Sequence, residues 1–188
     1  MKKLLALATA LTVVLLLSVG PAAAQTYPIA VDRNSVTLTY WPIGVGVLAG
    51  TSGTAAGLSY QFNPQWDLLV GYRSGPGGPP TPTLFTFGGR YHLRPPAPGW
   101  DTFATVQYAS PSGGAASYLM VGGGAVQNVA PGVKAYEIAT YAFLPAGANI
   151  FTNLGLQFEL QRNWSFVTGL DVSTGTGYLG VTFDFSTR

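Results

Sequence analysis

The sequence contains no cysteine. This excludes disulfide bonds, thiolate metal sites and lipid attachment to a cysteine at the N-terminal end. It has one histidine, His92, and its carboxylates are scattered, so no spacing typical of a metal site appears. Hydrolytic chemistry would also need that histidine beside a serine or an aspartate, and the pattern gives this little support. The sequence therefore predicts a protein without cofactor or metal that is not an enzyme.

Charge is also scarce, because only 9% of the residues are charged. An ordinary soluble domain has roughly 25% charged residues, and its surface would be hard to build from this chain. Lys2 and Lys3 account for the whole excess of 9 basic over 7 acidic residues. The rest of the chain has no net charge, and nothing in it is typical of a nucleic-acid binding protein.

The only long apolar run lies at the N-terminus. A basic start, an apolar stretch over residues 4–19 and small residues ending at Ala24 have the layout of a secretory signal peptide. The stretch is short for a membrane anchor. We therefore expect residues 1–24 to be cleaved and residues 25–188 to form one domain. Beyond Ala24 no apolar run approaches the roughly 20 residues that a membrane helix needs, so a chain that spans a membrane would do so as a closed barrel.

A repeated segment carries the clearest structural signal. Residues 155–169 align without a gap on residues 57–71. In both copies, aromatic or aliphatic residues alternate with polar or small ones, and Trp66 or Trp164 then closes a tight turn. Alternation with a period of two predicts a strand with one apolar face. No helix and no obvious second sheet is available to cover that face, which leaves lipid as its cover.

The same alternation recurs along the chain and predicts an all-β fold. Turns at Asn63, Pro95, Pro131 and Arg162 fall on one side, together with both termini. This arrangement predicts a transmembrane antiparallel up-and-down β-barrel of ten strands. If residues 112–150 formed one elaborate loop instead, the barrel would have eight.

Two places depart from a regular pattern. We expect the first strand to run from Ser35 to about Gly50, with a bulge near residues 41–44, because Pro42 removes a ladder hydrogen bond. Phe103 falls on the polar face of its strand, against the alternation around it.

Several of these features resemble the small outer-membrane β-barrel proteins of diderm bacteria, the OmpA-type and OmpW-type group. They are the signal peptide, the Asn-Pro-x-Trp turn after a Gly-Leu-x-Tyr-x-Phe strand, and a last strand that ends in Phe-x-Phe. Family members usually end on the final aromatic residue, whereas residues 186–188 follow it here. The peptidoglycan-binding domain of many OmpA-type proteins has no counterpart in the sequence, so no cell-wall tether is implied.

The resemblance implies a place in the bacterial outer membrane. The chain would contact outer-membrane lipid and the barrel-assembly machinery, and we expect a monomer. The machinery would read the apolar row of the last strand, formed by Leu179, Val181, Phe183 and Phe185.

Most ionisable residues fall on the face opposite the apolar rows, which would be the inside of the barrel. They are Asp67, Arg73, Arg90, His92, Asp101, Glu159, Asp171 and Asp184. A barrel of eight to ten strands is narrow, and unpaired buried charge is costly. We therefore predict a polar network that plugs the lumen, in which Arg73 and Arg90 pair with Glu159, Asp171 or Asp184. A polar path for small solutes is the functional alternative.

The aromatic residues form a second candidate site. A group of them clusters beside the turns that carry proline and asparagine, where an interfacial girdle would lie. Its members are Tyr60, Phe62, Trp66, Tyr91, Trp100, Phe158 and Trp164. A platform that binds carbohydrate or apolar ligands would also use aromatic residues, but it would gather them on one patch.

Three functions remain open at this point. The first is an outer-membrane barrel with a structural or surface role. The second is a small passive channel for small or apolar solutes. The third, from another class, is a secreted soluble β-sandwich that binds a ligand or a surface. The sequence identifies no ligand.

Overall fold

The structure is a computed structural model. It describes residues 33, 35–41, 53–74, 83–93, 100–145, 147–173 and 175–185. The predicted signal peptide, the bulge expected near Pro42, the turn at Pro95 and residues 186–188 lie outside the described residues.

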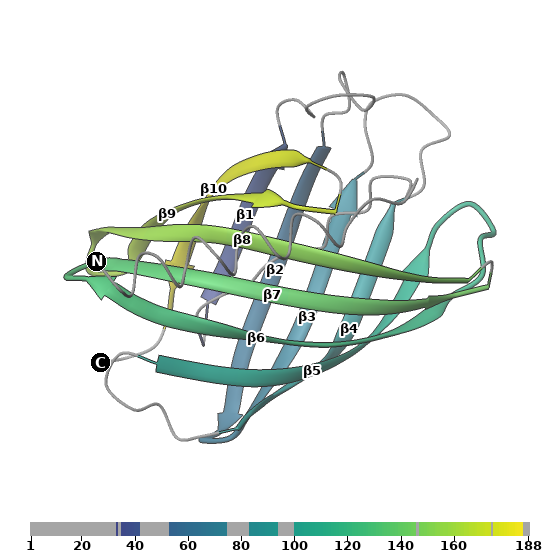
Figure 1. Ribbon diagram of the computed structural model, residues 1–188, viewed down its shortest axis with the longest axis horizontal. Coiled ribbons are helices and arrows are strands. Elements are labelled where there is room, and N and C mark those ends of the chain that lie inside the picture. The colour runs from purple at the N-terminus through teal and green to yellow at the C-terminus, as the bar shows by residue number, and fades with distance from the viewer. Residues whose placement is uncertain are drawn as a thin grey trace.

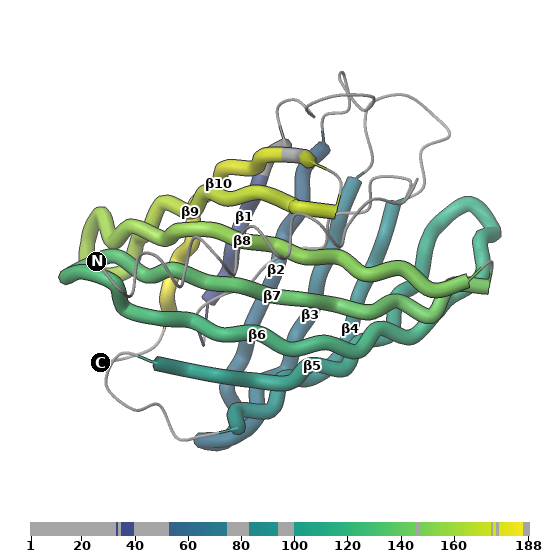
Figure 2. Tube along the Cα trace, in the orientation of Figure 1, coloured from purple at the N-terminus to yellow at the C-terminus, as the bar shows by residue number. Residues whose placement is uncertain are grey.

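Ten antiparallel strands form one closed barrel, in which each strand pairs with its neighbours in sequence and β1 pairs with β10 (Figures 1 and 2). The strands are β1 (Ser35–Trp41), β2 (Gly53–Asn63), β3 (Trp66–Ser74), β4 (Leu84–His92), β5 (Trp100–Pro111), β6 (Tyr118–Ala130), β7 (Val133–Leu144), β8 (Gly147–Gln161), β9 (Trp164–Asp171) and β10 (Thr176–Asp184). The predicted all-β, ten-stranded up-and-down barrel is confirmed. Because β6, β7 and the start of β8 occupy residues 118–150, the eight-stranded alternative is wrong, and closure of the sheet excludes a β-sandwich. Among the described residues no helix is long and apolar enough to cross a membrane.

The two faces of the wall differ as the alternation predicts. On β4, Phe85 and Phe87 point outward and are about half exposed, at 49% and 52%. Thr86, Arg90 and His92 point inward and are 1% exposed. The same division recurs around the barrel, so the outer surface is mainly apolar and the interior carries most of the polar side chains.

The repeated segment corresponds to two hairpins, β2–β3 and β8–β9. In the first, the Oδ1 of Asn63 accepts a hydrogen bond from the backbone N–H of Trp66 at 2.9 Å. The Trp66 ring then lies 4.9 Å from that of Tyr91 on β4, at an interplanar angle of 53°. Trp164 has the same distance and angle to Phe183 on β10. Each tryptophan therefore ties its hairpin to the following strand on the outer face.

Glu137 is an exception to the rule that charged side chains of the strands point into the barrel. It lies on the outer face of β7, exposed, directly opposite Ala125 of β6 and Leu154 of β8. Within the ten described strands it is the one Asp, Glu, Lys, Arg or His side chain that points outward. The sequence pattern did not single it out, because no apolar row stands out on this strand.

Candidate functional site in the barrel interior

A buried ion pair joins β3 and β4 inside the barrel. Asp67 and Arg90 are opposite each other in the strand register. The Nε of Arg90 donates to Oδ2 of Asp67 at 2.8 Å, and its Nη2 donates to the Ser59 hydroxyl at 2.9 Å. All three residues are at most 1% exposed. A charge buried without its partner is strongly destabilising. Loss of either Arg90 or Asp67 would therefore destabilise the barrel, which indicates a structural role for this pair.

His92 extends the ion pair toward β5. Its Nε2 lies 2.9 Å from Oδ2 of Asp67, and its Nδ1 lies 2.8 Å from Oδ1 of Asp101. Ionised carboxylates only accept hydrogen bonds, so both ring nitrogens donate together only in the protonated imidazole. In that form His92 and Arg90 balance the two carboxylates, and Arg33 lies 3.9 Å from Asp101 at the edge. Neither ring nitrogen is left to act as a base toward a hydroxyl, and the arrangement suits a structural role.

Phe103, which breaks the alternation of its strand, covers this cluster. It points inward from β5 and is 3% exposed. Its ring centroid lies 5.1 Å from Cζ of Arg90 and 6.1 Å from the His92 ring, so it adds a cation–π contact. Gly124, opposite it on β6, makes room, because a Cβ there would lie 2.8 Å from the Phe103 ring. Sequence reasoning could have used this irregularity as a signal for a ring packed against charge.

A second interior contact was not predicted. Tyr136 on β7 and Tyr178 on β10 are 4% and 2% exposed, and their hydroxyl groups lie 2.7 Å apart. They pack with Val167 of β9 and with Ala55 of β2. Because these residues come from well-separated parts of the wall, their contact crosses the interior. The available signal is the same as for Phe103, namely a large aromatic residue on the inward face.

Apolar side chains form a third interior group near the other ends of the strands. Met120 of β6 and Phe151 of β8 are both 1% exposed and pack together with neighbours from β4 to β8. The whole cluster is Leu84, Ala109, Tyr118, Met120, Ala142 and Phe151.

The other ionisable residues predicted for the lumen lie away from the Arg90 cluster. Arg73 follows Asp67 by six positions on β3, which places it about 20 Å further along the strand. Asp171 is buried at the end of β9, where it accepts a hydrogen bond from the backbone N–H of Ser173 at 3.0 Å. From the sequence we predict Glu159, Asp171 or Asp184 as the partner of Arg90, whereas its ion pair in the structure is with Asp67 on the adjacent strand.

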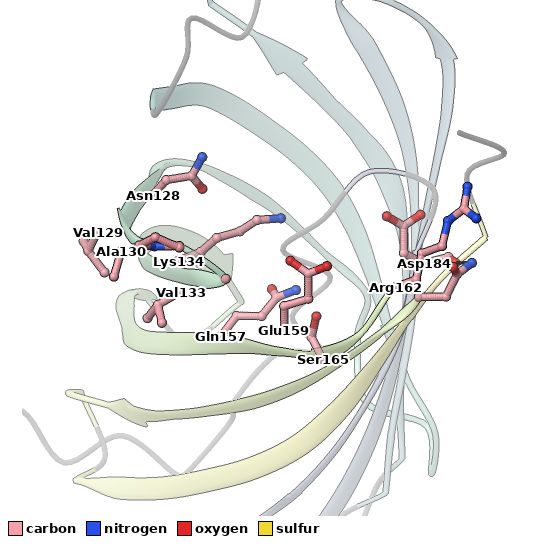
Figure 3. Close-up of a pocket in the computed structure, with 13 residues that line it drawn as sticks. Asn128, Val129, Ala130, Val133, Lys134, Gln157, Glu159, Arg162, Ser165 and Asp184 are labelled. Carbon is pink, nitrogen blue, oxygen red and sulfur yellow. Dashed lines mark hydrogen bonds between the residues drawn. The ribbon is translucent and has the colours of Figure 1, made fainter.

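Glu159 and Asp184 line a cavity of about 410 Å³ at the end of the barrel where the Asn63 and Arg162 turns lie (Figure 3). A smaller cavity of about 40 Å³ lies further inside and is lined partly by Arg90, Phe103 and Asn153. The Oδ1 of Asn153 is buried there and has no hydrogen-bond partner among the described residues. Within these residues no group of three or more His, Cys, Asp or Glu side chains is placed to hold a metal ion.

The predicted interfacial aromatic residues point outward near the end of the barrel where the β2–β3 and β8–β9 turns lie. They are Tyr60, Phe62, Trp66, Tyr91, Trp100, Phe158 and Trp164. The predicted assembly row, Leu179, Val181, Phe183 and Phe185, follows the outer side of β10 and the residue after it.

Comparison with known proteins supports the fold. No family model matches this chain, and no curated protein matches it. The structure of the KdgM porin in complex with disordered oligogalacturonate has a TM-score of 0.50 and 12% sequence identity, with 81% of this chain and 99% of that chain covered. The N-terminal β-barrel domain of Pseudomonas aeruginosa OprF has a TM-score of 0.33 and 15% identity, with 81% and 98% covered. A de novo designed transmembrane β-barrel has a TM-score of 0.40 and 13% identity, with 81% and 96% covered.

At these identities the KdgM similarity shows the fold alone. The chain has the fold of an outer-membrane β-barrel. The finer resemblance to OmpA-type and OmpW-type proteins stays a prediction.

Proposed function

We propose that this chain is an integral β-barrel protein of the bacterial outer membrane, with a structural or surface role and a lumen closed by its own side chains. The observation that carries this proposal is that the outer face of the barrel is apolar and the inner face is polar, the reverse of a soluble protein. Large apolar residues point outward from the barrel, whereas Asp67, Arg90 and His92 are buried within it. A lipid environment favours this arrangement, and water outside the barrel would not.

The outward aromatic residues support the same placement. Trp66, Trp100 and Trp164 are the first residues of β3, β5 and β9, lie at the same end of the barrel and are exposed. Tryptophan and tyrosine are enriched where a membrane meets water, so these residues would mark the interface on that side. Both described ends of the chain lie at this side, which would face the periplasm.

Contacts between distant strands support a closed lumen. The Tyr136–Tyr178 hydrogen bond joins β7 to β10, and these residues form one buried cluster with Ala55 of β2 and Val167 of β9. The Asp67–Arg90–His92 cluster and the Phe103 ring fill the part of the interior next to β3, β4 and β5. In a narrow barrel such side chains can fill the cross-section.

Fractionation tests the membrane assignment. The full chain, expressed with its predicted signal peptide, should stay with the outer membrane after washing with high salt and then with carbonate. A soluble protein, or one released by either wash, would contradict the proposal.

Conductance tests the closed lumen. The purified protein in planar bilayers should show at most small and rare steps. Arg90→Ala should enlarge or multiply them, because it removes the ion pair and the cation contact with Phe103. Glu137→Ala, which truncates a charged side chain on the outer face of β7, is the matched control and should leave the steps unchanged. Large, steady currents from the unmodified protein would contradict closure.

A small passive channel is the second candidate, and the cavities in the interior favour it. The cavities of about 410 Å³ and about 40 Å³ are both lined partly by polar side chains. The KdgM structure is described as a porin with an oligogalacturonate. Steady currents, or uptake of small or apolar solutes that depends on this protein, would favour this function over the structural one.

A further inference from the structure

The cavity of about 410 Å³ at the turn end of the barrel has a size typical of sites for small molecules. It lies between the β6–β7 turn and the β8–β9 turn and opens at the end of the barrel. Four charged residues line it: Lys134 from β7, Glu159 from β8, Arg162 from the β8–β9 turn and Asp184 from β10.

The charges of this cavity are balanced but spread around it. Lys134 and Glu159 extend toward its open centre, and Arg162 and Asp184 lie at the opposite wall (Figure 3). Among the described residues, neither Glu159 nor Arg162 has an ion-pair partner within 4.0 Å. A small anion or cation would meet one favourable group and one of like charge. A molecule with both an ammonium and a carboxylate group can satisfy both.

Hydrogen bonds hold the rim in place. The backbone N–H of Glu159 donates to the carbonyl of Gly132 at 2.7 Å, which ties β8 to the β6–β7 turn. The backbone N–H of Asp184 donates to the carbonyl of Asn163 at 2.9 Å, and the Asn163 amide donates back to the Asp184 carbonyl at 2.7 Å. A rim fixed in this way loses little freedom when a ligand binds, which favours the binding of small ligands.

We propose that this cavity binds a small zwitterion of the size of an amino acid or a dipeptide. Its ammonium group pairs with Glu159 and its carboxylate pairs with Arg162, the planar donor group suited to carboxylates. This proposal rests on the proposed function in one respect: if the chain is an outer-membrane barrel in the orientation given above, the cavity faces the periplasm.

The test uses the purified full-length mature barrel in detergent and glycylglycine as the probe. Amide chemical shifts of residues around the cavity should change and saturate, with a Kd on the order of 1 mM, typical of a weak small-molecule site. Acetate and methylammonium, which carry one charge each, should give no saturable change over the same range. Absence of saturation with glycylglycine, or equal binding of a singly charged probe, would overturn the proposal.

Two variants with a matched control locate the site. Glu159→Gln and Arg162→Gln should each weaken glycylglycine binding about tenfold, because each removes one charge-assisted contact. Glu137→Gln makes the same chemical change on the outer face of β7 and should leave binding unchanged. Unchanged binding in both cavity variants, or an equal loss in Glu137→Gln, would place any binding elsewhere.

The two proposals can fail separately. Release of the protein from the outer membrane by carbonate would contradict the proposed function, while glycylglycine binding by the purified barrel would stand. Firm membrane association without saturable binding would leave the barrel function intact and remove the zwitterion site.

Discussion

The hydroxyl groups of Tyr136 on β7 and Tyr178 on β10 lie 2.7 Å apart, although β8 and β9 separate their strands in the wall. The hydrogen bond therefore connects two strands that are not neighbours, through the interior of the barrel. Tyr136→Phe or Tyr178→Phe should each lower the free energy of unfolding by about 1–3 kcal/mol, because the remaining hydroxyl stays buried. The double variant should cost less than the sum. A urea titration of refolding measures all three, and strictly additive penalties would show that the bond contributes no coupling.

Gly155 should tolerate no side chain, because it lies beneath Tyr136. A Cβ at this position would collide with the Tyr136 hydroxyl and lie 2.5 Å from the carbonyl oxygen of Thr168. Gly155→Ala should therefore lower stability by about 1–3 kcal/mol. Gly177→Ala on β10 is the control, since its nearest heavy atom would be 3.8 Å away. Equal refolding midpoints for the two variants would contradict the tight packing of Tyr136.

Leu156 and Gln157 are adjacent on β8 but face opposite sides. Leu156 is 39% exposed on the outer face, and Gln157 is 2% exposed on the inner face. Leu156→Arg should cost about 2–4 kcal/mol if it lies near the midplane of the membrane. Gln157→Arg should cost less, because the new side chain can extend into the cavity at the turn end. Reversed penalties in a refolding titration into lipid vesicles would mean that the register of β8 is shifted by one residue.

Glu137 places a carboxyl group on the face that would meet lipid. Glu137→Leu should raise the free energy of unfolding in vesicles by up to about 2 kcal/mol, since acidic residues on the lipid face destabilise such barrels. Glu159→Leu, at the solvent-accessible cavity, should bring no comparable gain. A loss of stability in Glu137→Leu would show that this carboxylate has a favourable role in the membrane.

Export should remove the first 24 residues. If Ala22 and Ala24 are the small residues before the cleavage site, mass spectrometry of the outer-membrane form should find Gln25 as the first residue. A membrane form that retains Met1 would contradict this assignment.

Alternation along most of the strands was enough to predict the barrel and the facing of their residues, although β7 has no clear apolar row. Arg90 and His92 could be assigned to the interior in this way, because they alternate with Tyr91 and Leu93, which belong to the apolar row. The partner of Arg90 could not be predicted, since the register between β3 and β4 depends on a long connecting segment rich in glycine and proline. Contacts across the lumen, such as that between Tyr136 and Tyr178, depend on the curvature and stagger of the whole sheet. A single sequence contains no local pattern from which such contacts across the lumen could be predicted.

The matching Trp66–Tyr91 and Trp164–Phe183 contacts extend the structural similarity of the two hairpins to a third strand, β4 in one case and β10 in the other. At both places a turn is followed by a tryptophan whose ring lies 4.9 Å from an aromatic ring on the next strand, at an interplanar angle of 53°. Each hairpin therefore contacts its following strand through rings on the outer face, which leaves the inward positions of these strands to other side chains.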